Sequence, residues 1–351
     1  MSKDVYGKLR EFLDKMPGGY PTTESGVEIK ILKKLFNPEE AETTMHLTAM
    51  PEAVPVIAGR LGMDENKASS RLESIARKGL ILRVRMGDDV FYMANSFIVG
   101  IFEFSINRID REFSELLDEY SPYLAKLWEN VPTKQLRVIP IGSSLDATQA
   151  VSTYDRIRDL VKDKELISVA TCVCTKNQGL LEHPCDRPKE RCIQFDLAAQ
   201  YYLENKIARQ INMEELMDLL KMGEEKALVI SPTNAKDIVN ICMCCGCCCE
   251  FLGSLKRTSR PADQIKSSFL AQIDPELCVV CGTCAERCQM EAIKEKDEYC
   301  EVDTARCIGC ALCVTTCPEE AISLVDKPEP TPPPENIIEM KMKISEERGI
   351  L

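Results

Sequence analysis

Residues 278–293 read CVVCGTCAERCQMEAI, and residues 307–322 read CIGCALCVTTCPEEAI. The second stretch repeats the first, with cysteines at the same four places and Ala-Ile at the end of each copy. Each copy has the spacing C-x2-C-x2-C-x3-C, which puts three thiols on one tight loop and a fourth on the segment that follows. Three thiolates on one loop can hold three corners of a metal cluster, so the repeat predicts a cluster-binding unit.

Cysteine use in the whole chain indicates metal chemistry as well. The 351 residues include 19 cysteines and only two histidines, His46 and His183. No stretch reaches the ~18 consecutive apolar residues that span a bilayer, and the polar N-terminus lacks the apolar segment of a secretory signal. We therefore expect a cytoplasmic protein without membrane insertion, in which dense thiols are metal ligands or redox groups rather than disulfides. Thiolate-rich sites favour zinc or iron–sulfur clusters.

The spacing of the repeat favours iron–sulfur clusters over zinc. Structural zinc sites typically use two separated cysteine pairs, not four cysteines in one run. In this repeat pattern the fourth cysteine of each copy ligates the other cluster. We therefore predict two [4Fe-4S] clusters with exchanged fourth ligands. The first ligand set is Cys278, Cys281, Cys284 and Cys317, and the second is Cys307, Cys310, Cys313 and Cys288.

The segment around the repeat, residues 270–326, closely resembles the bacterial 2[4Fe–4S] ferredoxin domain. The resemblance implies a small βαβ-βαβ unit that passes electrons singly between two cubane clusters. Val280 stands at the position of Gly309 in the second copy, and Ala311 stands at the position of Gly282 in the first. Side chains at these places change the contacts to the cluster, so we expect the two clusters to be inequivalent.

Ten further cysteines lie in a central part of the chain, residues 131–262. They occupy two segments, C-x-C-x10-C-x6-C and the run CMCCGCCC. We expect the first segment to form one ligand group and the run to contribute a second, with shared or exchanged members. Neighbours in an extended segment point to opposite sides, so the run cannot face a single metal. These cysteines predict an additional iron–sulfur or zinc centre: Cys172, Cys174, Cys185, Cys192, Cys242, Cys244, Cys245, Cys247, Cys248 and Cys249.

The apolar pattern of the central part predicts a small α/β layer. Strands are expected at 136–142 and 166–174 with a helix at 147–164 between them. Ile193, Leu197 and Tyr201 predict a further helix, because they recur at four-residue steps. Another helix is expected to begin near Asn212, with a capping box to Glu215, and to end at Gly223; the stretch KALVISPT after it predicts a strand.

Residues 1–130 carry no cysteine and predict a different module. Between 28 and 93 the pattern indicates three helices and a hairpin, and this region resembles a winged helix–turn–helix, a fold that often binds DNA. Residues 24–110 contain 11 basic and 13 acidic side chains, although the expected wing carries Arg83 and Arg85. Since DNA binding needs a basic face, the composition favours a docking module, with DNA recognition as the alternative.

The remaining segments predict connections. Residues 96–128 are expected to form one long amphipathic helix. The stretch KPEPTPPPEN within 327–351 predicts a stiff linker, followed by a short helix that could tether to a partner. The expected fold class is thus multidomain α+β: a winged-helix module with its long helix (1–130), a Cys-rich α/β domain (131–262), a ferredoxin-like dicluster domain (263–326) and the tail (327–351).

Electron transfer is the function that these features favour. The protein is expected to pass single electrons through two [4Fe-4S] clusters to or from the central Cys-rich centre and a partner oxidoreductase. Larger ferredoxin-like proteins of anaerobes are similar in carrying a C-x-C loop and a CxCCxCCC run before the two-cluster domain. Two alternatives stay open: an iron–sulfur redox-sensing transcriptional regulator, and a disulfide or thiol reductase. Cys300 is expected to be a semi-buried extra thiol, and His183 a solvated loop residue.

Overall fold

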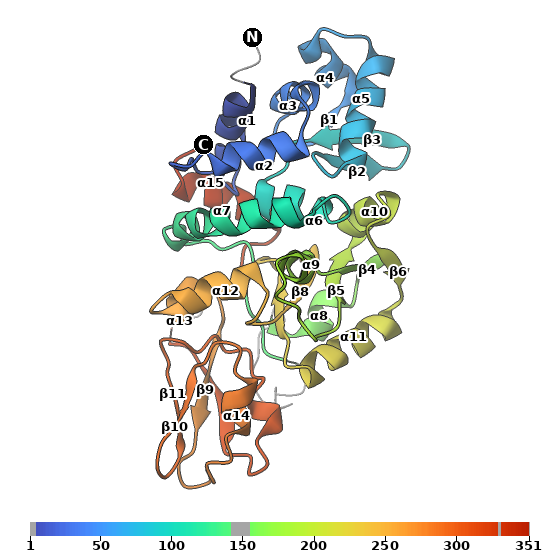
Figure 1. The fold of residues 1–351 in the computed structure, drawn as a ribbon. Helices are drawn as coiled ribbons and strands as arrows, with labels where there is room; N and C mark the ends of the chain where they lie inside the picture. The colour runs from blue at the N-terminus through green and yellow to red at the C-terminus, as the bar shows by residue number, and fades with distance from the viewer. Residues whose placement is uncertain (1–4, 142–154, 329–330, 351) are drawn as a thin grey trace.

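The structure, a computed structural model, describes residues 5–141, 155–328 and 331–350 (Figure 1). Three parts follow one another along the long direction of the molecule. The N-terminal helices lie at one end, a sheet with its helices lies in the middle, and the cysteine repeat lies at the other end. Helices and strands are mixed throughout, as the sequence predicts.

The N-terminal module, which we define as α1 to α7, combines its helices with a small sheet against which α4 and α5 pack. The sheet has the strand order β1-β3-β2 and is antiparallel. Its elements are α1 (Val5–Asp14), α2 (Val27–Leu35), α3 (Pro38–Met45), β1 (Glu52–Ala53), α4 (Val54–Leu61), α5 (Glu65–Arg77), β2 (Leu82–Met86), β3 (Asp89–Met93), α6 (Phe102–Phe104) and α7 (Arg111–Glu129). The expected hairpin is present as β2 and β3.

Two expectations for this module are wrong. The region 28–93 has four helices instead of three, because α3 begins with a capping box in which Asn37 and Glu40 satisfy each other's backbone N–H groups. The helix expected over 96–128 is interrupted, because Asp110 caps a new helix by accepting a hydrogen bond from the Phe113 N–H. Before it lie only a kinked turn (Phe97–Ile101) and the single turn α6.

The central part is built on a five-stranded sheet with the order β6-β4-β5-β8-β7. Every neighbouring pair in it is antiparallel. Its elements are α8 (Ile157–Val161), β4 (Ile167–Thr171), α9 (Val173–Leu180), β5 (Glu190–Phe195), α10 (Asp196–Glu204), β6 (Arg209–Ile211), α11 (Met213–Glu225), β7 (Val229–Pro232), β8 (Asn240–Cys244), α12 (Glu250–Arg257) and α13 (Pro261–Gln264).

The antiparallel sheet corrects the expected α/β layer. Ile193 lies in β5 opposite Ile241 of β8, not in the helix that carries Tyr201. Of the strand expected at 136–142, the described residues form only isolated bridges, and the helix expected at 147–164 is limited to α8, with 142–154 outside the described residues. Asn212 caps α11 as predicted, although the helix continues past Gly223.

The cysteine repeat folds into two interleaved halves. Strands β9 (Phe269–Ile273) and β12 (Ile322–Asp326) pair with each other, and β10 (Ile293–Glu295) pairs with β11 (Cys300–Val302). Helix α14 (Thr283–Arg287) follows the first loop, and a 3-10 turn (Val314–Thr316) takes its place in the second copy. One continuous core of buried side chains joins this unit to the central sheet.

The C-terminal helix and the wing both pack against other parts of the chain. Helix α15 (Ile337–Glu347) lies beside the N-terminal module (Figure 1), where the guanidinium of Arg348 donates to the Met16 carbonyl at 2.5 Å. In the wing strand β2, Arg83 is 3% exposed and is paired with Glu204 of α10 at 2.5 Å. Arg85 is bonded to the same carboxylate at 2.9 Å. The wing arginines therefore face the central part of this chain.

Candidate metal centres

The first four-cysteine set predicted from the repeat lines one small hollow. Cys278, Cys281 and Cys284 come from the first loop, and Cys317 comes from the end of the second copy. Backbone N–H groups point at these sulfurs: Ala321 donates to Cys317 Sγ at 3.3 Å, and Cys300 donates to Cys278 Sγ at 3.3 Å. Such N–H···S bonds stabilise thiolates that hold a cluster.

The second set lines a separate hollow. It contains Cys307, Cys310 and Cys313 with Cys288 from the first copy. Ala292 donates its N–H to Cys288 Sγ at 3.2 Å, and Ala271 of β9 donates to Cys307 Sγ at 3.4 Å. Burial raises the pKa of the Cys310 thiol to about 12, so a bound metal that replaces the proton is the natural way to ionise it.

Both hollows therefore contain the chemistry that a cubane needs: four thiols and backbone donors in an apolar wall that includes Ile273, Ile322 and Leu312. The structure brings the eight repeat cysteines together in the two predicted groups, including the exchanged fourth member of each. No three of them approach within 4.8 Å of one another among the described residues, in contrast to the central cysteines. The wider spacing fits a cluster in which each thiolate meets a different iron atom.

Cys300 is a fifth thiol in the first hollow. It is 1% exposed, and hydrogen bonds and charge link its side chain to Cys278 and Cys284. The sequence predicts a semi-buried thiol without a role, whereas the structure places this side chain against the candidate ligands. Cys300 reaches this hollow because β11, which carries it, pairs with β10. Its position in the hollow does not distinguish Cys300 from the four candidate ligands.

The cysteine run of the central part divides between two thiol groups. The first group, which we call the thiol cage, is Cys185, Cys245, Cys247 and Cys248, whose four sulfurs all lie within 4.8 Å of one another. The second, which we call the thiol string, links its members one after another: Cys172, Cys174, Cys249, Cys244, Cys242 and Cys192. The run thus contributes three members to each group; Cys244 and Cys245 face opposite sides as expected of neighbours in a strand, whereas Cys247 and Cys248 lie in a turn and join the same group.

One upstream cysteine is exchanged between the two groups, as the sequence analysis left open. Cys185 leaves Cys172, Cys174 and Cys192 and joins the thiol cage instead. The reason is the strand pairing of the sheet, which sets Cys192 of β5 opposite Cys242 of β8. Cys185 lies on the loop between α9 and β5, outside that pairing.

Arg191 is a site residue that the sequence analysis did not identify. Its side chain is 1% exposed, and its Nη2 group donates to Cys248 Sγ at 3.0 Å. Its Nε and Nη1 groups are buried without a hydrogen-bond partner among the described residues. Burial opposes its charge, but the nearby Cys172 and Cys245 thiolates raise the pKa of the guanidinium. A buried guanidinium beside thiols indicates an anionic centre. In the sequence, the signal that could have identified Arg191 as a site residue was its place directly before Cys192.

Cys245 is one of the central thiols whose ionisation the surroundings favour. The hydrogen bond with Cys248 and the charge of Arg191 lower the pKa of Cys245 to about 3, against the effect of burial. Within the thiol string, the hydrogen bond from Cys174 and the charge of Arg191 lower the pKa of Cys172 to about 7. Cys245 and Cys172 are therefore favoured as thiolates, the form that binds metals, whereas burial and the hydrogen bond with Cys245 raise the pKa of Cys247 to about 12.

The N-terminal module supplies an acid beside the thiol string. Burial, together with the charges of Cys242 and Cys172, raises the pKa of Glu103 to about 8. Its carboxylate accepts a hydrogen bond from the Gly100 N–H at 2.6 Å. The buried phenol of Tyr202 lies near the same sulfurs, and burial raises its pKa well above the ordinary value.

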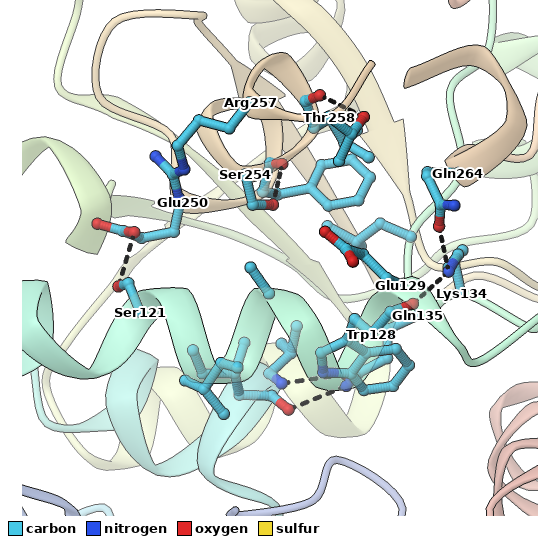
Figure 2. A pocket seen from close by; sticks show the side chains of 17 residues that line it. Ser121, Trp128, Glu129, Lys134, Gln135, Glu250, Ser254, Arg257, Thr258 and Gln264 are labelled. Carbon is cyan, nitrogen blue, oxygen red and sulfur yellow. Dashed lines mark hydrogen bonds between the residues drawn. The ribbon is translucent and has the colours of Figure 1, made fainter. Parts of the chain in front are cut away.

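An apolar cavity of about 150 Å³ lies away from the thiols, between α7 and α12 (Figure 2). Figure 2 shows Ser121 of α7 bonded to Glu250 of α12 on one side and Lys134 bonded to Gln264 on the other. Burial, with the charge of Lys266, lowers the pKa of Lys134 to about 8. Leu124, Trp128 and Phe251 are among the apolar walls, and its described lining includes no cysteine.

Neither histidine joins a thiol group. His183 is exposed on the loop after α9, as expected, and its backbone N–H donates to the Gln178 carbonyl. No helix among the described residues has the length and apolar character needed to cross a membrane.

The C-terminal unit, with four candidate ligand thiols in each of two hollows, has the arrangement of a dicluster domain. Residues 271–324 match the model of the family described as the 4Fe-4S dicluster domain. This match confirms the ferredoxin-type resemblance of the repeat. Comparison of the chain with curated proteins and with solved structures found no match.

Proposed function

We propose that the protein transfers single electrons through two [4Fe-4S] clusters to or from the thiol-rich central part and a partner oxidoreductase. The first cluster would be held by Cys278, Cys281, Cys284 and Cys317, and the second by Cys307, Cys310, Cys313 and Cys288. When bound, each cluster supplies a one-electron redox couple. The chain holds the thiolates, excludes water from them and directs backbone N–H groups at their sulfurs.

One contact carries the proposal that the central part takes part in the same path. Gly246, which lies inside the thiol cage sequence, donates its N–H to the side-chain oxygen of Gln289 at 2.8 Å. Gln289 directly follows Cys288 of the second hollow. A Cβ atom on Gly246 would lie 2.4 Å from the Gln289 carbonyl oxygen, so the two backbones are in direct contact. The segment that carries the central thiols and the wall of the second hollow are thus in direct contact through Gly246 and Gln289.

The N-terminal module fits a docking role better than DNA recognition. Arg83 and Arg85, the basic residues of the wing, are both engaged by Glu204 of the central part. The Tyr201 hydroxyl of α10 also donates to the carbonyls of Ala76 and Ile81. A wing that is bonded in this way cannot offer its arginines to phosphate groups without losing these contacts. We infer that the module covers the thiol string and contributes to the surface for a redox partner.

Metal analysis of anaerobically purified protein tests the electron-transfer proposal. We expect about eight iron and eight sulfide per chain from the repeat and a paramagnetic signal after reduction with dithionite. Cys278→Ser and Cys307→Ser should each remove about four iron, because each disrupts one four-thiolate site. The wild-type protein should pass electrons from a reduced dye to an acceptor dye, and both variants should be slower. Colourless protein, or wild-type turnover in both variants, would refute the proposal.

A further inference from the structure

The thiol cage has the dimensions of a site for one metal ion. Cys245 Sγ lies 3.1 Å from Cys248 Sγ and 3.2 Å from Cys247 Sγ. Cys185 Sγ lies 3.6 Å from Cys247 Sγ and 4.0 Å from Cys245 Sγ. Four thiolates at about 2.3 Å from a tetrahedral ion are about 3.8 Å apart, because that is the edge of such a tetrahedron. The observed separations scatter around this value.

The repeat cysteines provide the comparison within the same molecule. They line hollows of the dicluster class, and among the described residues no three of their sulfurs lie as close together as those of the cage. A cubane spreads its four thiolates over four iron atoms, so its ligands cannot converge on one point. The two kinds of cysteine site therefore differ in size, and the cage is the smaller one.

The charge around the cage suits a thiolate-bound ion. Four thiolates and one divalent cation leave a net charge of two negative units, and a buried site needs compensation for it. Arg191 provides a positive charge with Nη2 at 3.0 Å from Cys248 Sγ, and its guanidinium also interacts with Cys245 of the cage. Thr175 places its hydroxyl 3.3 Å from the same sulfur. Such partners orient metal ligands.

The cage is also accessible to an ion from solution. Cys245 and Cys248 are buried, whereas Cys247 is exposed and Cys185 is half-buried. The side of the cage formed by Cys247 and Cys185 thus faces outward, and Arg191 lies on the inner side against Cys248. A site with this arrangement can be loaded after folding and then shielded on its inner side.

We propose that the thiol cage binds one divalent metal ion, iron or zinc, in tetrahedral coordination by four thiolates. Softness of the ligands selects these metals from the common divalent ions. The site is separate from the two clusters of the repeat and does not depend on whether electrons flow. The thiol string lies outside it.

The test uses the full chain purified without oxygen, with iron, zinc and sulfide measured per chain. Cys245→Ser should lose one ion and no sulfide. Cys244→Ser is the matched control, since Cys244 is the neighbouring buried thiol and belongs to the thiol string; it should keep that ion. Retention of about eight iron in both variants shows that the repeat still folds and separates this test from that of electron transfer. Whether the lost ion is iron or zinc identifies the occupant.

A cobalt-loaded sample gives a second measurement. Co²⁺ added to metal-depleted protein should produce the intense visible bands of tetrahedral cobalt–thiolate coordination in wild type and Cys244→Ser, and not in Cys245→Ser. Loss of about four iron with four sulfide from Cys245→Ser would show a cubane instead and overturn the proposal. Unchanged metal content in Cys245→Ser would overturn it as well.

Discussion

Replacing Gly309 with alanine would place a Cβ atom 2.2 Å from the carbonyl oxygen of Phe269 and 2.5 Å from Ser267 Oγ. Phe269 cannot move away easily, because it lies in β9 and pairs with Asp326 of β12. Gly309 also has φ at +66°, where a side chain is unfavourable. Overpacking of about 1–3 kcal/mol and a backbone term of about 1 kcal/mol together predict a loss of about 2–4 kcal/mol for the second loop.

Gly282 is the control, because it is the glycine of the first loop and also has a positive φ, although the position that matches Gly309 in the repeat is Val280. Its φ is +76°, but the nearest atom to an added Cβ is Glu295 Oε1 at 2.8 Å. That side chain is exposed and can swing away, so Gly282→Ala should cost only the backbone term of about 1 kcal/mol. Val280 and Ala311 already have side chains at positive φ in these loops, which shows that the backbone shape alone does not demand glycine.

The assay is retention of iron under a chelator challenge, with denaturant unfolding as a second measurement, both without oxygen. Gly309→Ala should lose about four iron per chain, those of the second site, while Gly282→Ala keeps nearly the wild-type amount. Equal iron loss in the two variants would show that backbone conformation, not contact with β9, decides the outcome. Wild-type iron and stability in Gly309→Ala would refute the packing argument altogether.

Three other perturbations test separate parts of the structure. Arg83→Met should lower the free energy of unfolding by about 3 kcal/mol, because Arg83 is the buried cation that pairs with both Glu73 and Glu204. The more exposed Arg85→Met should cost about 1 kcal/mol or less, and similar denaturant midpoints for the two variants would contradict this. Cys300→Ser should keep about eight iron per chain, since four other thiols line its hollow, and loss of about four would instead make Cys300 a ligand. Burial lowers the pKa of Lys134 to about 8 in the folded protein. Between pH 8 and about 10.5 the Lys134 amine is therefore protonated in the unfolded chain and neutral in the folded one, so the free energy of unfolding rises with pH in this range. Between pH 7.5 and 10 the free energy of unfolding of the wild type, measured by denaturant, should rise by about 2–3 kcal/mol relative to that of Lys134→Met. Parallel pH profiles for the two proteins would show that the pKa of Lys134 is not lowered in the folded state.

Local signals in the sequence predicted some elements well and missed others. Asn212 indicated the start of α11 because a capping box depends only on residues three positions apart. The same signal at Asn37 and Glu40 marks α3, and it was overlooked. Ile193 was misplaced because four-residue spacing across a strand and the following helix imitates a single helix. Pairing with Ile241, which lies far along the chain, is what makes that segment a strand.

Cysteine spacing by itself determined the class of the C-terminal unit, because three members of each predicted set share one short loop. It also predicted which four cysteines of the repeat line each hollow. The division of the ten central cysteines needed the folded chain. Which of them meet depends on the pairing of β5 with β8 and on the loop that carries Cys185, and no short-range pattern encodes those contacts. Arg191 became visible as a site residue for the same reason: burial and the partners of a side chain arise only when distant segments pack together.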